Sequence, residues 1–375
     1  MNFSVKKKSI VEFLNLASSI VEKRNTMPIL ANVKISVEDK TLTMMATNLD
    51  ISVYSEIEAN VVIPGEITAN AKNLAEIVNE LPGEVINFSI SKGQRIDIES
   101  GNSTFKINGL SAIEYPKIQG VDLKNPVSVE ARKISEMLEK VSFAVSQEET
   151  RYNINGVYVE TIEQKIVKDK KGIRFVATDG HRLAVIDRPA EGLAFSKNVI
   201  LPRKGTSEIR KLVENNTGVA YVSVNNSFFI IRSGGITLGL RLIDGEYPNY
   251  SKVIPSEIST EFTTNKSELL AAVKRVSLVT TDQCRALCFD LNNNNLRIYS
   301  SSPEFGEADE QLTVKQSGKD VRIGFSARYI TELLTAMSGS EMVTVKLNGE
   351  NGPGLFLSDN DEYYKCVVMP MRFDF

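Results

Sequence analysis

The sequence predicts an α+β fold of three similar domains, each with two helices packed on antiparallel strands. Two observations support this prediction: one hydrophobic pattern occurs three times along the 375 residues, and strands of period two follow each helix. The chain is too long for one ordinary core, whereas a third of it is a common domain size. We therefore expect domains at residues 1–124, 125–255 and 256–375, with boundaries near Asn125-Pro126 and Pro255.

Each repeat opens with a short strand and an amphipathic helix. In the first repeat, residues 2–5 precede apolar residues spaced three and four apart over residues 10–21. The same spacing recurs over residues 134–145 and 269–276. This spacing places the apolar side chains on one helix face, so we expect one helix at each of the three places.

A pair of alternating strands follows each of these helices, and a second helix with further strands completes the repeat. Strands of period two bury one face, and the edges they leave open need partners. We therefore expect sheets shared between neighbouring domains. The strand pairs are residues 33–37 and 41–44, 156–159 and 173–176, and 287–291 and 296–299. A strand that runs into the second helix is expected at 67–81, 199–213 and 321–337, with further strands at 85–90, 221–224 and 343–347.

Composition and charge narrow the possible functions. Apolar residues make up 42% of the chain and charged residues 24%, as in ordinary globular proteins. A net charge of −3 argues against a tight, static nucleic-acid binder but permits a local basic surface. No apolar run approaches the ~20 residues of a membrane span, and no apolar segment of a secretory signal follows Lys6, Lys7 and Lys8. Three cysteines are too few for a disulfide framework, which favours a reducing cytoplasm.

The sequence contains no familiar catalytic motif. It lacks nucleophile-elbow, phosphate-loop, dinucleotide-binding and zinc-protease signatures. His181 is the single histidine, and Asp179 could orient it as a general base. However, Asp-Gly is ordinary turn chemistry, so we favour a structural or recognition turn at this place.

Two further groups of residues invite a metal-site interpretation that we do not favour. Cys284 and Cys288 lack two additional ligands nearby, so buried or edge-strand thiols are the better interpretation. An acidic cluster could bind a divalent cation, but a solvated loop or a charged contact surface suits it better. The cluster consists of Glu304, Glu307, Asp309 and Glu310.

Basic residues gather on several of the expected helices. They form either a basic stripe or ordinary solvated faces, and acidic residues on the same helices (Glu136, Glu139, Glu208) dilute the pattern. The basic residues are Arg203, Lys204, Arg210 and Lys211 on the second helix of the second repeat, and Lys133, Lys140, Lys274 and Arg275 on first helices.

Several motifs along the whole chain match one family. They are residues 27–30, 151–156, 176–185 (VATDGHRLAV), 202–205 and the end 367–372 (VVMPMR). The T-D-G-H-R-L-A run and the terminal M-P-M-R are together highly specific. With these motifs the chain resembles the bacterial sliding clamps, the β subunits of the DNA polymerase III holoenzyme.

The resemblance implies a non-catalytic accessory subunit of the DNA-directed DNA polymerase III holoenzyme. It implies a processivity factor whose homodimer forms a head-to-tail ring of six domains around double-stranded DNA, without sequence preference. It implies no cofactor, no metal, no catalytic residue and no membrane contact, and a place in the cytoplasm at the nucleoid. The implied partners are the replicative polymerase catalytic subunit, the clamp loader, translesion polymerases, and mismatch-repair and ligase proteins, all docking through short linear peptides.

The resemblance also assigns roles to residues. The implied peptide-binding residues are Ile154, Thr178, Gly180, His181, Arg182, Leu183, Pro248, Lys252, Val253, Val368, Met369, Pro370, Met371 and Arg372. The implied DNA-binding residues are Arg24, Tyr152, Arg203 and Lys204, and the implied dimer contact joins Phe105 and Ile107 to Leu278 and Val279. Aliphatic and methionine walls suit Leu or Phe anchors of varied partners.

Four places depart from the family's pattern. Lys252 replaces an arginine at the pocket edge, and Asn153 replaces an aromatic residue. Asn102 and Thr104 replace basic residues at the dimer edge, which weakens the expected pairing with the acidic cluster. Residues 373–375 extend past the usual end, and we expect them to cover part of the pocket.

Two alternatives to a clamp remain at this point. One is an enzyme, such as a hydrolase using Asp179 and His181, although no partner residues complete its site. The other is a monomeric adaptor that keeps the peptide pocket and has lost the ring, which the altered dimer edge at Asn102 and Thr104 would favour.

Overall fold

A computed structural model describes residues 1–21, 27–91, 93–148, 150–167, 170–189, 198–214, 216, 218–281 and 286–372, with the backbone alone at 163–167, 170 and 171. The chain forms two compact units. Unit 1 comprises Met1–Ser135 and Lys204–Leu242, and unit 2 comprises Glu136–Arg203 and Ile243–Phe375. Both units combine parts of more than one repeat, so the boundaries at residues 124 and 255 stay a prediction.

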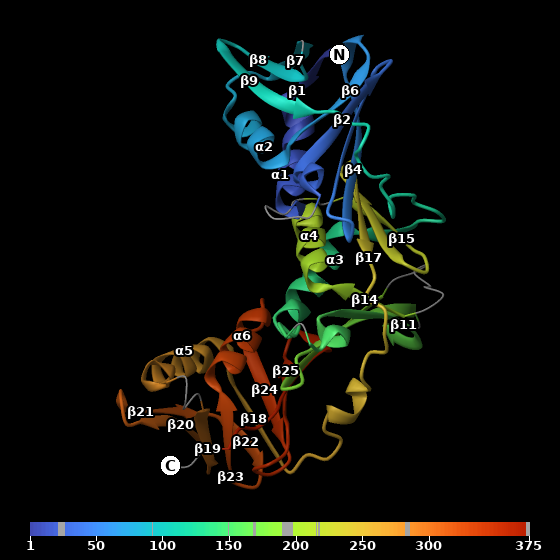
Figure 1. Ribbon diagram of the computed structural model, residues 1–375. Coiled ribbons are helices and arrows are strands. Elements are labelled where there is room, and N and C mark those ends of the chain that lie inside the picture. The colour runs from blue at the N-terminus through green and yellow to red at the C-terminus, as the bar shows by residue number, and fades with distance from the viewer. Residues whose placement is uncertain are drawn as a thin grey trace. The chain divides into compact units, whose positions relative to one another are not determined.

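The helices expected from the repeats are present. Among the described residues, the α-helices are α1 (Lys7–Ile20), α2 (Ala71–Glu80), α3 (Ala131–Ser142), α4 (Arg203–Val213), α5 (Lys266–Val276) and α6 (Ala327–Ala336). Asn70, Asn265 and Ser326 cap α2, α5 and α6 by accepting hydrogen bonds from backbone N–H groups in the first turn. Helices α1 and α2 pack together, as do α5 and α6 (Figure 1).

Unit 1 contains one antiparallel sheet that both of its repeats share. Its strand order is β10-β15-β16-β17-β4-β3-β2-β6-β9-β8-β7-β1-β5. Strand β17 of the second repeat pairs with β4 of the first, for example Leu238 opposite Val53. The bounds are β1 Asn2–Lys6, β2 Asn32–Glu38, β3 Thr41–Thr47, β4 Ile51–Glu58, β5 Asn60–Ile63, β6 Gly65–Asn70, β7 Val85–Ser91, β8 Arg95–Ser100, β9 Ser103–Leu110, β10 Val127–Glu130, β15 Val219–Val224, β16 Phe228–Ser233 and β17 Ile236–Arg241.

Unit 2 repeats this arrangement with a sheet of order β14-β11-β12-β13-β26-β25-β24-β18-β22 and a smaller sheet of order β21-β20-β19-β23. Here β26 of the third repeat pairs with β13 of the second, with Ala184 opposite Cys366. The bounds are β11 Gly156–Val167, β12 Lys170–Thr178, β13 Arg182–Pro189, β14 Val199–Pro202, β18 Thr260–Asn265, β19 Ala286–Asn292, β20 Asn295–Ser302, β21 Gly306–Thr313, β22 Lys315–Gly318, β23 Val321–Ser326, β24 Met342–Leu347, β25 Gly354–Ser358 and β26 Asp361–Val368.

The predicted fold class and the sheets shared between repeats are therefore confirmed. Successive repeats join edge to edge, because β4·β17 and β13·β26 pairs satisfy strands that would otherwise expose their N–H and C=O groups. In the described part of the chain, no helix is both long enough and apolar enough to cross a bilayer.

Candidate functional site

Unit 2 contains a cavity of about 150 Å³ where β13 and β26 meet. Its floor is apolar: Ile154, Leu183 and Val367 are 6%, 2% and 2% exposed. A short 3₁₀ helix, Tyr250–Val253, forms one wall. The full lining is Ile154, Thr178, Gly180, Arg182, Leu183, Pro248, Asn249, Tyr250, Val253, Val367 and Met369.

A tight turn between β12 and β13 forms the polar rim of this cavity. The Thr178 hydroxyl donates to the Arg182 carbonyl at 2.6 Å and accepts from the Gly180 N–H at 3.1 Å. The Asp179 carboxylate accepts from the N–H groups of His181 and Arg182 at 2.9 and 3.0 Å. Gly180 has φ +88°, a left-handed conformation that glycine adopts without strain. The T-D-G sequence therefore specifies the turn locally.

Unit 1 contains the same turn at its own joint between repeats. Thr47 donates to the Ile51 carbonyl at 3.0 Å, and Asn48 accepts from the N–H groups of Asp50 and Ile51. The Leu49 N–H donates to the Thr47 hydroxyl, and Leu49 has φ +81° in the place where unit 2 has Gly180. The turns at the two joints thus have the same hydrogen-bond pattern and the same left-handed residue position.

Arg182 supports the cavity from behind. Its guanidinium is 4% exposed and donates to the Asp179 carboxylate at 3.0 Å, to Glu332 of α6 and to the Phe143 carbonyl. It also lies 4.4 Å from the centre of the Tyr329 ring. Because its donors are used inside the protein, we interpret Arg182 as a residue that fixes the turn. The family resemblance implies a direct contact between Arg182 and the peptide, which stays a prediction.

The geometry at His181 does not favour the hydrolase alternative. The Asp179 carboxylate is engaged by backbone N–H groups and by Arg182, so it caps the turn. The His181 ring stacks on Tyr329, with 6.4 Å between ring centres, and its carbonyl accepts from the Met369 N–H at 2.8 Å. This arrangement makes His181 part of the joint between β13 and β26.

The structure brings most of the predicted peptide-binding residues to one cavity, and it adds three that sequence reasoning missed. Eight line the cavity: Ile154, Thr178, Gly180, Arg182, Leu183, Pro248, Val253 and Met369. The other six lie outside its described lining: His181, Lys252, Val368, Pro370, Met371 and Arg372. The additions are Asn249, Tyr250 and Val367. The repeated tripeptide Glu-Tyr-Pro at 114–116 and 246–248 was the available signal for this wall.

The structure describes some of the positions where the sequence departs from the family pattern. Lys252 is exposed, and the Asn153 amide donates to the Glu246 carbonyl at 3.2 Å. The Met371 N–H donates to the Gly324 carbonyl at 2.8 Å, which ties the terminal segment to β23. Residues 373–375 lie outside the described residues, so their expected cover over the pocket stays a prediction.

The predicted DNA-binding residues are accessible where they are described. Tyr152 is 61% exposed, and Arg203 and Lys204 are exposed at the first turn of α4. Arg24 lies outside the described residues.

Lys140 of α3 fits neither of the two interpretations of the basic residues, a basic stripe or a solvated helix face. This side chain is 7% exposed and bonds Asp361 at 2.6 Å. Lys133, Lys211 and Arg275 pair with Glu130, Glu208 and Glu310. These pairs reduce the free positive charge that the sequence pattern suggested.

The predicted dimer residues lie at open sheet edges, one in each unit. On β9, Phe105 is 38% exposed. One side of β9 pairs with β8, and on its other side the described residues pair with β6 only at Gly109 and Leu110. In unit 2, β21 ends its sheet, and Leu278 on the adjoining 3₁₀ helix Ser277–Val279 is 78% exposed.

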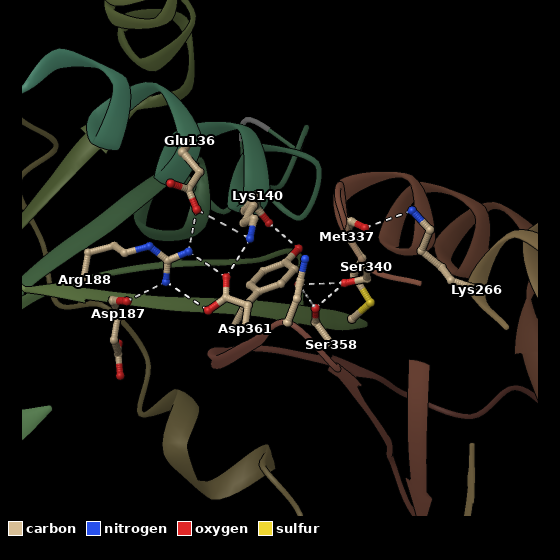
Figure 2. Close-up of polar contacts among 11 residues, drawn as sticks. Glu136, Lys140, Asp187, Arg188, Lys266, Met337, Ser340, Ser358 and Asp361 are labelled. Atoms are coloured by element: carbon tan, nitrogen blue, oxygen red, sulfur yellow. Dashed lines mark hydrogen bonds and ion pairs between the residues drawn. The ribbon is translucent and has the colours of Figure 1, made fainter. Parts of the chain in front are cut away.

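Near the joint of unit 2, a buried ionic network connects α3, β13 and β26 (Figure 2). Asp361 accepts from Lys140 at 2.6 Å and from both terminal nitrogens of Arg188 at 3.0 and 2.6 Å. Glu136 completes it by pairing with Arg188 and Lys140. Burial opposes ionisation of Asp361, but the hydrogen bonds from Arg188 and Lys140 outweigh it and hold its pKa below the usual value.

The metal-site interpretations gain no support from the described residues. There, no group of three or more His, Cys, Asp or Glu side chains is arranged to hold a metal ion. Cys288 and Cys366 are buried thiols, and burial raises the pKa of both. Cys284 lies outside the described residues. In the acidic cluster, Asp309 and Glu310 form ion pairs with Arg297 and Arg275.

Comparisons with known proteins agree over the full length of the chain. Three family models match in order: the N-terminal domain of the DNA polymerase III beta subunit at residues 1–119, the central domain at 128–249 and the C-terminal domain at 251–372. The beta sliding clamp of Caulobacter vibrioides is 32% identical over 375 residues, covering 99% of this chain and 100% of the relative. That of Pseudomonas aeruginosa is 29% identical over 374 residues, with the same coverage.

Solved structures give the same result. The Caulobacter crescentus pol III beta structure has a TM-score of 0.92 at 31% identity, covering 100% of both chains. A Bartonella birtlesii sliding clamp bound to griselimycin has a TM-score of 0.92 at 31% identity, again covering 100% of both chains. This chain therefore belongs to the DNA polymerase III beta subunit family, the beta sliding clamps.

Proposed function

We propose that this chain is a DNA sliding clamp, a processivity factor that encircles duplex DNA, slides along it and tethers polymerases and repair proteins. The observation that carries this proposal is the ordered match of all three family domains over residues 1–372. The family is a non-catalytic accessory subunit of the replicative polymerase. The turn-capping role of Asp179 agrees with that, since it removes the partner that a His181 base would need.

Ring closure would come from a head-to-tail homodimer. The open edge of β9 in one protomer could pair with the edge strand β21 of the other. Each edge carries unpaired backbone groups and has exposed apolar side chains nearby. Asp309 and Glu310 of β21 already pair with Arg297 and Arg275 within the chain. Because these ion pairs neutralise the acidic charge of β21, the facing edge does not need basic residues. The neutral residues Asn102 and Thr104 are therefore compatible with this contact.

DNA contact would be weak and independent of sequence. Arg203 and Lys204 sit at the first turn of α4, where the helix dipole adds positive potential to their charges. These two residues attract DNA phosphates, but the net charge of −3 of the whole chain keeps the overall attraction for DNA weak. Topological linkage then supplies retention, and sliding stays fast.

Partner proteins would dock short peptides into the unit 2 cavity. Its apolar floor and its rim of Thr178 and Met369 suit a Leu or Phe anchor. A related clamp from Bartonella birtlesii has been solved with griselimycin bound. The expected partners are the replicative polymerase catalytic subunit, the clamp loader, translesion polymerases, and mismatch-repair and ligase proteins. The expected location is the cytoplasm, at the nucleoid.

The test combines native mass with retention on DNA. Native mass spectrometry of the 41.5 kDa chain should give a dimer, and the protein loaded on nicked circular DNA should remain through gel filtration. Cutting the circle once should release it. Equal loss from circular and linear DNA would contradict topological tethering, and a monomer that still binds partner peptides would establish the adaptor alternative.

A further inference from the structure

The cavity wall in unit 2, residues 248–253, lies outside the sheets and rests on the apolar core through the ring of Tyr250. It belongs to the connection between β17 and β18 and pairs with no sheet. Within residues 248–253, five residues are exposed and Tyr250 alone is half-buried. This segment nevertheless supplies Pro248, Tyr250 and Val253 to the cavity lining. Something must hold the wall in place for the cavity to keep its shape.

The hydroxyl group of Tyr250 makes that attachment. It donates to the Glu160 carboxylate on β11 and accepts from Nη1 of Arg174 on β12 at 3.1 Å. Arg174 is itself fixed, because Nε and Nη2 donate to the two carboxylate oxygens of Asp187 on β13 at 2.6 and 2.7 Å. The phenol therefore binds the wall directly to β11 and β12, and Arg174 extends this link to β13.

Aromatic packing against β11 orients the Tyr250 ring. Tyr158 of β11 stacks on Tyr247 with 4.7 Å between ring centres, and meets Tyr250 edge-on at 6.4 Å. The Asn198 amide donates to the Tyr158 hydroxyl at 2.9 Å. Tyr247 and Tyr250 thus both pack on Tyr158 of the sheet, and the Tyr250 hydroxyl bonds both Glu160 and Arg174.

We propose that Tyr250 is a positioning residue: its hydroxyl, bound to Glu160 and Arg174, holds the wall so that the peptide cavity exists before a peptide arrives. We call the contacts of the Tyr250 hydroxyl with Glu160 and Arg174 the latch. Because the wall is already ordered in the free protein, peptide binding costs less conformational entropy, so the latch raises peptide affinity. This inference rests on the proposed function of the cavity as a peptide site. The latch itself is a property of the free protein and can be measured without any peptide.

The first readout is trypsin cleavage after Lys252, which is exposed within the wall. Tyr250→Phe keeps the ring and removes the hydroxyl, so the wall should open more often. Cleavage at this bond in the full chain should rise at least about tenfold, the effect expected for losing a hydrogen bond to a charged group. Unchanged cleavage at Lys252 would overturn the latch.

The second readout is the affinity of a labelled peptide with Leu and Phe anchors, measured by fluorescence anisotropy. Tyr250→Phe should weaken binding roughly five- to tenfold. Glu160→Gln should weaken binding less than Tyr250→Phe does, because the amide oxygen still accepts from the phenol although its charge is gone. Tyr221→Phe, at a tyrosine 47% exposed on β15 in unit 1, is the matched control and should change neither readout.

The two readouts separate failure of the latch from failure of the proposed function. If the unmodified chain binds no partner-derived or anchor peptide, the peptide function fails while cleavage at Lys252 still reports on the latch. If Tyr250→Phe increases cleavage but leaves peptide affinity unchanged, the positioning role is refuted. Increased cleavage together with weaker binding, with Tyr221→Phe unchanged, supports the proposal.

Discussion

Replacing Asp361 by Asn tests whether the buried ionic network stabilises the joint of unit 2. Asp361 is the shared acceptor of Lys140 and Arg188, which reach it from α3 and β13 (Figure 2). Its side chain is 8% exposed, and those of Lys140 and Arg188 are 7% and 15% exposed. The amide is isosteric, so the substitution removes charge while leaving the packing in place.

The structure sets the size of the effect. Removing one partner of a buried ion pair costs about 3–5 kcal/mol, because the remaining charge loses its compensation. Here Glu136 still pairs with Arg188, and lies 3.5 Å from Lys140, but it is 39% exposed. We therefore expect the lower end of that range, about 3 kcal/mol of unfolding free energy lost from unit 2.

Urea denaturation followed by circular dichroism measures this loss, and an exposed ion pair provides the control. In unit 1, Asp50 lies 3.5 Å from Arg241, with side chains 72% and 52% exposed. Asp50→Asn should therefore cost at most about 0.5 kcal/mol. If Asp361→Asn costs no more than Asp50→Asn, the network contributes nothing measurable and the reasoning from its burial is refuted.

The network also predicts a dependence on pH. Because the folded-state pKa of Asp361 lies below its usual value of 3.8, the stabilisation is complete above that value and is lost as pH falls through the folded pKa. Burial opposes the charge of Arg188, but its hydrogen bonds to Asp361 and Glu136 outweigh burial and raise its pKa, so Arg188 remains charged throughout this range. The stability difference between the unmodified chain and Asp361→Asn should thus be constant near neutrality and shrink below about pH 4. A difference that does not begin to shrink as pH falls below about 4 would contradict this assignment.

Three further predictions follow from other parts of the structure. Leu49→Asn should raise the thermal stability of unit 1 by about 1 kcal/mol, because asparagine tolerates the φ of +81° better than leucine; an unchanged melting temperature would argue against strain there. Arg203→Ala combined with Lys204→Ala should lower the salt dependence of DNA binding by a slope of about 2, measured by anisotropy from low to moderate salt. Leu278→Asp should dissociate the dimer in sedimentation velocity, whereas Ile113→Asp, at a residue 86% exposed and outside the predicted contact, should leave it intact.

The sequence was sufficient for the secondary structure and for the pairing of repeats into shared sheets. Apolar spacing over residues 10–21 and 269–276 predicted helices that the structure has at Lys7–Ile20 and Lys266–Val276. The T-D-G run predicted a turn because its side chains satisfy backbone groups only two or three residues away. Helices and turns of this kind depend on neighbours along the chain, so the sequence alone predicts them.

The sequence alone could not assign the charged and polar side chains. Lys140 looked like a member of a solvated basic face and is instead buried against Asp361, 221 residues away. Tyr250 lies in a polar connection, and its importance depends on Glu160 and Arg174, which belong to distant strands.

Tertiary structure decided these cases because a charge is stable in the interior only when partners from separate elements meet it. Hydrophobic periodicity determines which face of an element is buried. Which ions and hydroxyls face each other across that buried face depends on strand register and helix placement, and these exist only once β13 and β26 have paired. The repeated fold of this clamp was thus determined by sequence, and the support of its cavity by the packed joint.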